Sequence, residues 1–142
     1  MQKLNHHPFF VCAFSLLSLA KLAAQENNSG NISVSGHWEL TAIHEQPVLN
    51  ELFTQGIPYL VIEIKEPIFT GFTGCNLIRG NIEISGNNIK FLQLISSKKY
   101  CEGIPENEFL DALEKADRFL IKGNMLYLLN EVSVLLSFKM ID

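Results

Sequence analysis

Alternating apolar and polar residues run through most of the chain after residue 36, and this two-residue period predicts a series of short β-strands. In residues 37–44, for example, Trp38, Leu40 and Ala42 fall on one face of an extended chain. Gly-Asn turns separate two pairs of these segments, which indicates antiparallel hairpins. The other predicted strands are residues 59–65, 68–72, 77–85, 89–95, 118–122, 125–130 and 132–140.

The same alternation predicts which side chains of the later strands point into a core. Because neighbouring strands in a hairpin bury the same face of the sheet, inward residues are expected to lie opposite one another. The inward residues expected here include Ile95 and, in the second hairpin, Phe119 and Ile121 opposed by Met125, Tyr127 and Leu129.

One segment has a helical period instead. Pro105 suits the first turn of a helix, and Glu106 and Glu108 suit the positive end of its dipole. Phe109 and Leu113 recur at a spacing that forms one apolar face. The fold class is therefore mainly β (α+β): a small antiparallel β-barrel-like sheet of seven to eight strands, with one helix near residues 105–116.

The N-terminal residues read as a signal peptide over 1–24. Lys3 precedes a short apolar run at residues 8–20, which Lys21 ends, and Ala24 is a small residue suited to cleavage. The run is shorter than the ~20 apolar residues that a membrane span needs, although an uncleaved anchor is the alternative. Cleavage is expected after Ala20 or Ala24.

After the expected signal peptide, the chain divides into a polar, flexible leader at residues 25–35 and one domain at 36–140. We expect a periplasmic or secreted protein. Cys12 lies within the apolar run after bulky residues, so we do not expect a lipoprotein. The net charge of −4 becomes more negative once Lys3 and Lys21 are removed, which argues against nucleic acid as a partner.

Two cysteines, Cys75 and Cys101, remain in the expected mature chain. An even number in an oxidising compartment favours a structural disulfide; two free buried thiols and a redox-active pair are the alternatives. Gly71 and Gly74 frame a tight passage into Cys75. Asn76 follows directly, and its amide suits the capping of backbone groups better than it suits ligand binding.

Catalytic chemistry finds little support in the residue pattern. A thiol nucleophile needs a base, yet His37 and His44 lie an odd number of residues apart on one strand and so face opposite sides of the sheet. Neither histidine shares the usual metal-ligand spacing with a cysteine. We therefore expect no enzyme activity, no metal and no cofactor.

One set of spaced residues stands out along the chain: Trp38, Gly71, Gly74, Cys75, Asn76, Gly80, Cys101, Phe109 and Leu113. Together these residues resemble the META domain (HslJ-like) family, over about residues 36–138. The match departs from the family pattern just before Cys101, where Lys99 stands at a position that is commonly Met. The resemblance implies a small β-barrel-like domain with a helix, in exported or envelope-associated proteins linked to heat shock and without known enzymatic activity.

Two functional hypotheses follow. In the first, the protein is a monomeric, non-enzymatic envelope factor linked to stress that acts by binding an unknown protein partner. In the second, its barrel holds a small hydrophobic ligand or a lipid. Side chains nearly fill so small a barrel, which favours the first hypothesis. A thiol-dependent enzyme is a third and weaker hypothesis.

Overall fold

The computed structural model describes residues 33–141, which form nine β-strands and one α-helix. The expected signal peptide and residues 25–32 of the expected leader lie outside the described residues. The elements are β1 (Gly36–Ile43), β2 (Gln46–Pro47), β3 (Tyr59–Glu63), β4 (Ile68–Phe72), β5 (Leu77–Ser85), β6 (Asn88–Ser96), α1 (Glu106–Lys115), β7 (Arg118–Lys122), β8 (Met125–Asn130) and β9 (Ser133–Ile141).

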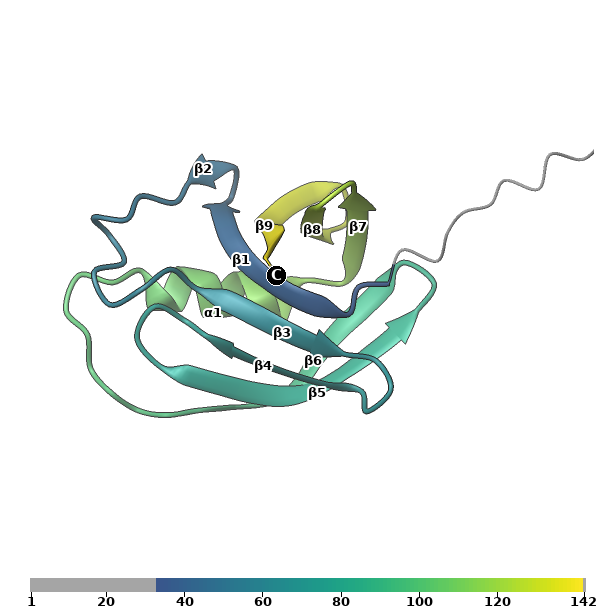
Figure 1. Cartoon of the computed structure of the whole chain (residues 1–142), viewed down its shortest axis with the longest axis horizontal. Helices are drawn as coiled ribbons and strands as arrows, with labels where there is room; N and C mark the ends of the chain where they lie inside the picture. Colours follow the sequence, from purple (N-terminus) through teal and green to yellow (C-terminus); the bar gives the residue numbers. More distant parts are fainter. Residues whose placement is uncertain (1–32, 142) are drawn as a thin grey trace, which may run out of the picture. The chain divides into compact units, whose positions relative to one another are not determined.

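The strands form one antiparallel sheet that curls back on itself (Figure 1). Its order is β2-β1-β3-β4-β5-β6-β7-β8-β9, and β1 also pairs with β9, from His37 opposite Ile141 to Ile43 opposite Leu136. This ring-like closure confirms the predicted barrel-like sheet. All eight predicted strands are present, and the two-residue strand β2 is an addition.

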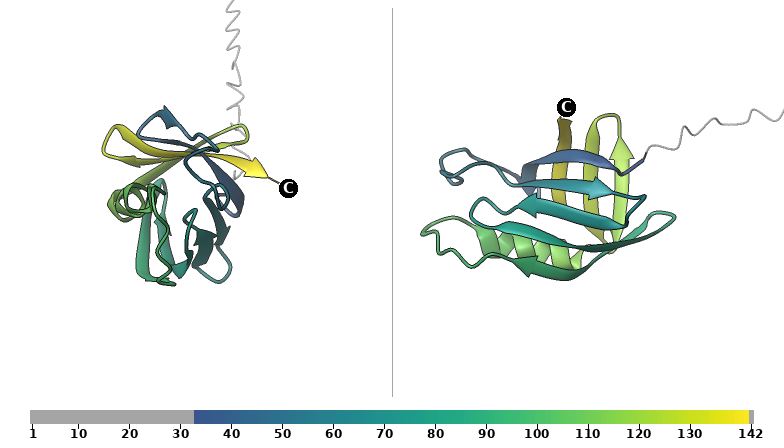
Figure 2. Two further views of the ribbon diagram at one scale, coloured as in Figure 1. Left: turned by 90° about the vertical axis from the view of Figure 1, so that its left-hand side faces the viewer. Right: turned by 60° about the horizontal axis from the view of Figure 1, so that its bottom comes forward.

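The ring is weakest between β6 and β7, which share one register pair among the described residues, Asn88 with Arg118. The helix α1 lies at this gap in both views of Figure 2 and packs against β1, β6 and β9. Phe109 and Leu113 on its apolar face are fully buried, and the Phe109 ring meets Phe138 edge-on at 6.4 Å between centroids. The helix therefore completes the enclosure that β6 and β7 leave open.

Large side chains fill the interior of the ring. Trp38 is fully buried, and its indole Nε1 donates a hydrogen bond to the carbonyl oxygen of Val34 at 2.8 Å. Val34, which falls in the expected leader, is itself part of the core. The other fully buried side chains of greatest volume are Phe69, Phe109, Phe138, Leu60, Ile62, Ile89, Leu113, Leu126, Leu128 and Leu136.

The prediction that Ile95 points inward is wrong. The pairing of β5 with β6 shifts between Arg79 and Asn81, and Gln93 in this bulge has a positive φ of 52°. An extra residue on one strand reverses the side-chain alternation beyond it. Leu94 consequently packs against the core, and Ile95 is turned outward with 59% of its surface exposed.

The predicted inward face of β8 is also wrong by one residue. The two-residue turn pairs Lys122 with Met125, so Leu126 lies opposite Ile121 and Leu128 lies opposite Phe119. Directly opposed residues share a face of the sheet, so Leu126 and Leu128 are the buried residues. They take the place of the expected Met125, Tyr127 and Leu129.

This corrected register can be tested with two truncations in the same hairpin. Replacing Leu128, which is 0% exposed, with alanine should lower the free energy of unfolding by about 2–5 kcal/mol, since it leaves a cavity in the core. The matched control Leu120→Ala, at a position 40% exposed, should cost less than about 1 kcal/mol. Urea unfolding measures both, and equal losses would contradict the register.

Candidate functional site

The turn between β4 and β5, which we call the Cys-Asn junction (residues 73–76), is held by its own hydrogen bonds. The Thr73 amide donates to the Asn76 carbonyl at 2.9 Å. The Thr73 hydroxyl oxygen accepts from the amides of Asn76 at 2.8 Å and Cys75 at 3.2 Å. Gly74 has a φ of 93°, and a Cβ there would overlap the Phe53 ring. Glycine is therefore required in this turn by both conformation and space.

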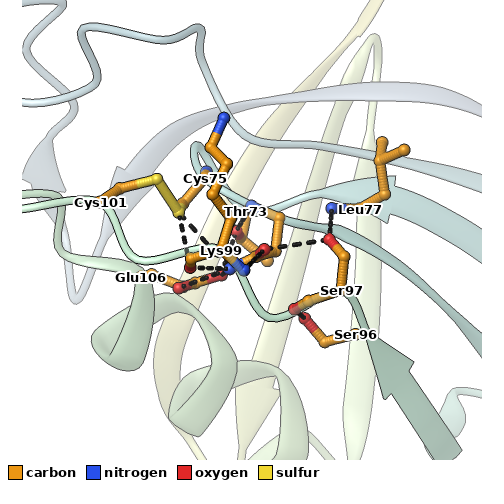
Figure 3. The surroundings of a disulfide bond; sticks show 9 residues. Thr73, Cys75, Leu77, Ser96, Ser97, Lys99, Cys101 and Glu106 are labelled. Atoms are coloured by element: carbon orange, nitrogen blue, oxygen red, sulfur yellow. Dashed lines mark hydrogen bonds between the residues drawn. A yellow bond between two sulfur atoms is a disulfide. The ribbon is translucent and has the colours of Figure 1, made fainter.

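A disulfide joins Cys75 of the junction to Cys101, with their Cα atoms 5.9 Å apart (Figure 3). Of the three states left open by the sequence, the structure thus has the bridged one. Cys75 is almost fully buried, whereas Cys101 is partly exposed in the loop that leads from β6 to α1. The bridge consequently ties this loop to the turn between β4 and β5.

The buried side chain of Asn76 makes a second set of links between the same segments. Its Nδ2 donates to the Lys99 carbonyl and to Glu106 Oε1, both at 2.9 Å. Its Oδ1 accepts from the Lys99 amide at 2.7 Å and from the Ser97 hydroxyl at 3.0 Å. Both ends of the amide are satisfied, so the buried side chain leaves no donor or acceptor unpaired.

Glu106, at the start of α1, connects the helix to the Cys-Asn junction. Its carboxylate accepts hydrogen bonds from the Asn76 amide and from the Thr73 hydroxyl, the latter at 2.5 Å. A negative charge is also favourable at the first turn of a helix. The junction therefore fixes where α1 begins relative to β4 and β5, a structural arrangement that leaves Asn76 no free polar atom for a ligand.

The remaining motif residues serve the core. A Cβ on Gly80 would lie 2.6 Å from the Leu92 carbonyl oxygen and 2.7 Å from the Phe69 ring. Only glycine therefore allows β5 to pack this closely against β6 and the Phe69 ring. On the neighbouring strand β4, Phe69 lies opposite Gly80, and Gly71 lies opposite Ile78. Trp38, Phe109 and Leu113 lie in the core, as described above. The structure thus brings Gly74, Cys75, Asn76 and Cys101 together and places the other motif residues elsewhere.

The two histidines do not approach the junction sulfurs as hydrogen-bonding partners in the described part of the chain. His37 packs edge-on against Tyr59, with ring centroids 4.9 Å apart, and His44 lies in the turn after β1 with a positive φ of 46°. No group of three or more His, Cys, Asp or Glu side chains within residues 33–141 is placed to hold a metal ion.

A groove on the outer face of β4, β5 and β6 was not predicted from the sequence. We call it the outer groove. One part, of about 570 Å³, reaches from Tyr59 across Leu77 to Ser97, and an adjoining part of about 310 Å³ reaches Asn81 and Gln93. Both parts share Thr70, Arg79 and Ile95.

The rim of the outer groove is apolar and accessible. Leu77 is 63% exposed and Ile95 is 59% exposed. Arg79, which is also exposed, lies two residues after Leu77 on β5 and directly opposite Ile95 on β6. The outward position of Leu77 follows from strand alternation alone. The position of Ile95 follows from the bulge at Gln93, for which the sequence carried no clear signal.

Comparison with known proteins identifies the family. The META domain model matches residues 31–141, and the chain belongs to the META domain family. No curated protein is similar enough in sequence to match it. Within residues 33–141, the structure has no helix long and apolar enough to cross a membrane.

Solved structures share the fold at low sequence identity. A protein from Burkholderia xenovorans, solved by NMR, has a TM-score of 0.61 and 19% identity, covering 75% of this chain and 82% of that chain. A DUF4847 family protein from Bacteroides vulgatus, solved by crystallography, has a TM-score of 0.57 and 18% identity, covering 76% of this chain and 94% of that chain.

The disulfide should contribute measurably to stability. It closes a loop with a sequence separation of 26, so reduction should lower the free energy of unfolding by about 3.5 kcal/mol in the chain-entropy model. Thermal and urea unfolding with and without reductant measure this. The double variant Cys75→Ser/Cys101→Ser should show no response to reductant, and an unchanged midpoint for the native chain would contradict the bridge.

Removal of the Asn76 side chain should be costly in a different way. Asn76→Ala removes the hydrogen bonds that the buried amide makes to the Lys99 backbone and to the Glu106 carboxylate, and we expect a loss of about 2–4 kcal/mol in the free energy of unfolding. The control is Asn81→Ala, which removes an exposed side-chain hydrogen bond to Gln93 and should cost less than about 1 kcal/mol. A similar loss for the two variants in urea unfolding would show that the network is not structural.

Proposed function

We propose that this META-domain protein is a non-enzymatic, exported factor that acts by binding another protein through the outer groove. The observation that carries the proposal is the contrast between the two faces of the sheet. Side chains fill the inner face, whereas the outer face presents Leu77 and Ile95 to solvent beside a groove. Exposed apolar residues gathered at a groove are typical of interaction sites.

The rigidity of this surface supports the same proposal. The strand β5 is paired on both sides, with β4 and with β6. The Cys-Asn junction and the disulfide lie next to Leu77 and fix the end of the groove. The backbone amide of Leu77 also donates a hydrogen bond to the Ser97 hydroxyl oxygen at 3.1 Å. A pre-ordered surface loses less conformational entropy on binding than a flexible one.

The compartment in the proposal rests on the signal-like N-terminus and on the disulfide, since such bridges persist in oxidising environments. We propose the periplasm or the extracellular space, with a stress-linked role in the cell envelope as the family resemblance implies. The protein acts there as a monomer without a cofactor, and its partner is an envelope protein.

A second candidate function is the binding of a small hydrophobic ligand. The interior is filled, so the site for it would be an apolar pocket of about 270 Å³ between the end of β1, the loop after β2 and the start of α1. The pocket is lined by Ile43, Val48 and Phe53, and also by Leu52, whose side chain is exposed. Its volume suits a ligand smaller than a typical lipid.

Position-dependent photocrosslinking in the producing cells tests the first function. A photoreactive phenylalanine analogue at Ile95 should crosslink to a discrete protein, because that side chain lies on the rim of the outer groove. The same analogue at Leu120, an exposed position on β7, is the control and should give no such product. Absence of a product at Ile95, or the same product at Leu120, would contradict binding through the outer groove.

A further inference from the structure

The outer groove carries a positive charge, that of Arg79, which has no acidic partner among residues 33–141. The ion pairs among residues 33–141 are Lys115 with Asp111 and Lys139 with Glu39, and Arg79 takes part in no side-chain hydrogen bond there. The neighbours of Arg79 along the groove are Thr70, Ile95 and the Asn81–Gln93 amide pair, none of which is acidic.

More positive charge lies at one end of the outer groove. Ser97 lines the groove, and Lys98 and Lys99 follow it directly with exposed side chains. In Figure 3 the side chains of Lys99 and Leu77 point the same way, away from α1. This local charge contrasts with the net charge of −4 for the whole chain, so it makes the groove complementary to an acidic partner.

The shape of the outer groove suits an extended chain. Leu77, Arg79 and Asn81 are alternate residues of β5, so the groove follows this strand for about 14 Å, the length of roughly five extended residues. Because β4 and β6 already occupy both edges of β5, a bound segment cannot add to the sheet there and must be recognised through side chains.

We infer that the outer groove binds an extended protein segment in which an acidic side chain is flanked by apolar ones. The carboxylate pairs with the Arg79 guanidinium, whose planar fork suits two parallel hydrogen bonds. The flanking apolar side chains pack on Leu77 and Ile95. The inference rests on the proposed function and names the chemical class of the partner segment.

The test uses NMR titration of the purified, isotope-labelled full chain with capped five-residue peptides. The peptides carry a central glutamate, glutamine or lysine between leucine and valine residues. The glutamate peptide should shift the backbone signals of Thr70, Leu77, Arg79 and Ile95. It should bind about tenfold more tightly than the glutamine peptide, as expected for a hydrogen bond to a charged group.

Two variants of Arg79 test whether a preference for the glutamate peptide arises at the outer groove. Arg79→Gln should abolish the preference for glutamate, and Arg79→Glu should transfer it to the lysine peptide. Arg118 on β7 is the only other arginine of the chain, so Arg118→Gln is the matched control and should leave the preference unchanged. Retained preference in Arg79→Gln, or shifts confined to other strands, would overturn the inference.

Failure of this inference is distinguishable from failure of the proposed function. A crosslink at Ile95 without any preference for the glutamate peptide would leave the proposed function standing. It would overturn the inference that the bound segment carries an acidic side chain. Sedimentation with phosphatidylglycerol vesicles tests whether the outer groove binds an anionic membrane surface instead. Vesicle binding that depends on Arg79, in the absence of peptide binding, would overturn the inference in favour of an anionic membrane surface.

Discussion

The pairing of the first long strand with the last is the constraint on which the rest of the fold depends. Closure of β1 on β9 turns a curled sheet into a ring, and it places Leu40 opposite Phe138 across the joined strands. Only then do the inward faces of distant strands enclose one volume. The helix α1 can cover the gap between β6 and β7 because this closure has already fixed the positions of β1 and β9 around it.

Closure leaves a sheet with two very different faces. The inner face packs Trp38 and other large side chains into a hydrophobic core. Within residues 33–141 the one helix, α1, lies at the gap, so no helix of this part of the chain covers the outer face. Apolar side chains on that face, such as Leu77, therefore remain available to a partner.

The Cys-Asn junction couples this outer face to the helix. Glu106 receives hydrogen bonds from Thr73 and Asn76 at the start of α1, while the disulfide holds the loop that leads to it. The same loop carries Lys98 and Lys99 to the end of the outer groove. The cysteines, for which the sequence favoured a structural disulfide, thus tie the loop to the turn, and the Asn76 amide is engaged at both ends within the same network.

The sequence by itself determined the eight main strands, the helix, the family and the close approach required at Gly74, because alternation, capping and turn residues act over short distances. It could not place Ile95, since the bulge at Gln93 depends on how β6 fits against Gly80 and the Phe69 ring. It also could not show that Arg79 forms no ion pair within residues 33–141. The pairing of β1 with β9 and the outer groove were decided only by tertiary structure, because they join residues far apart in the chain.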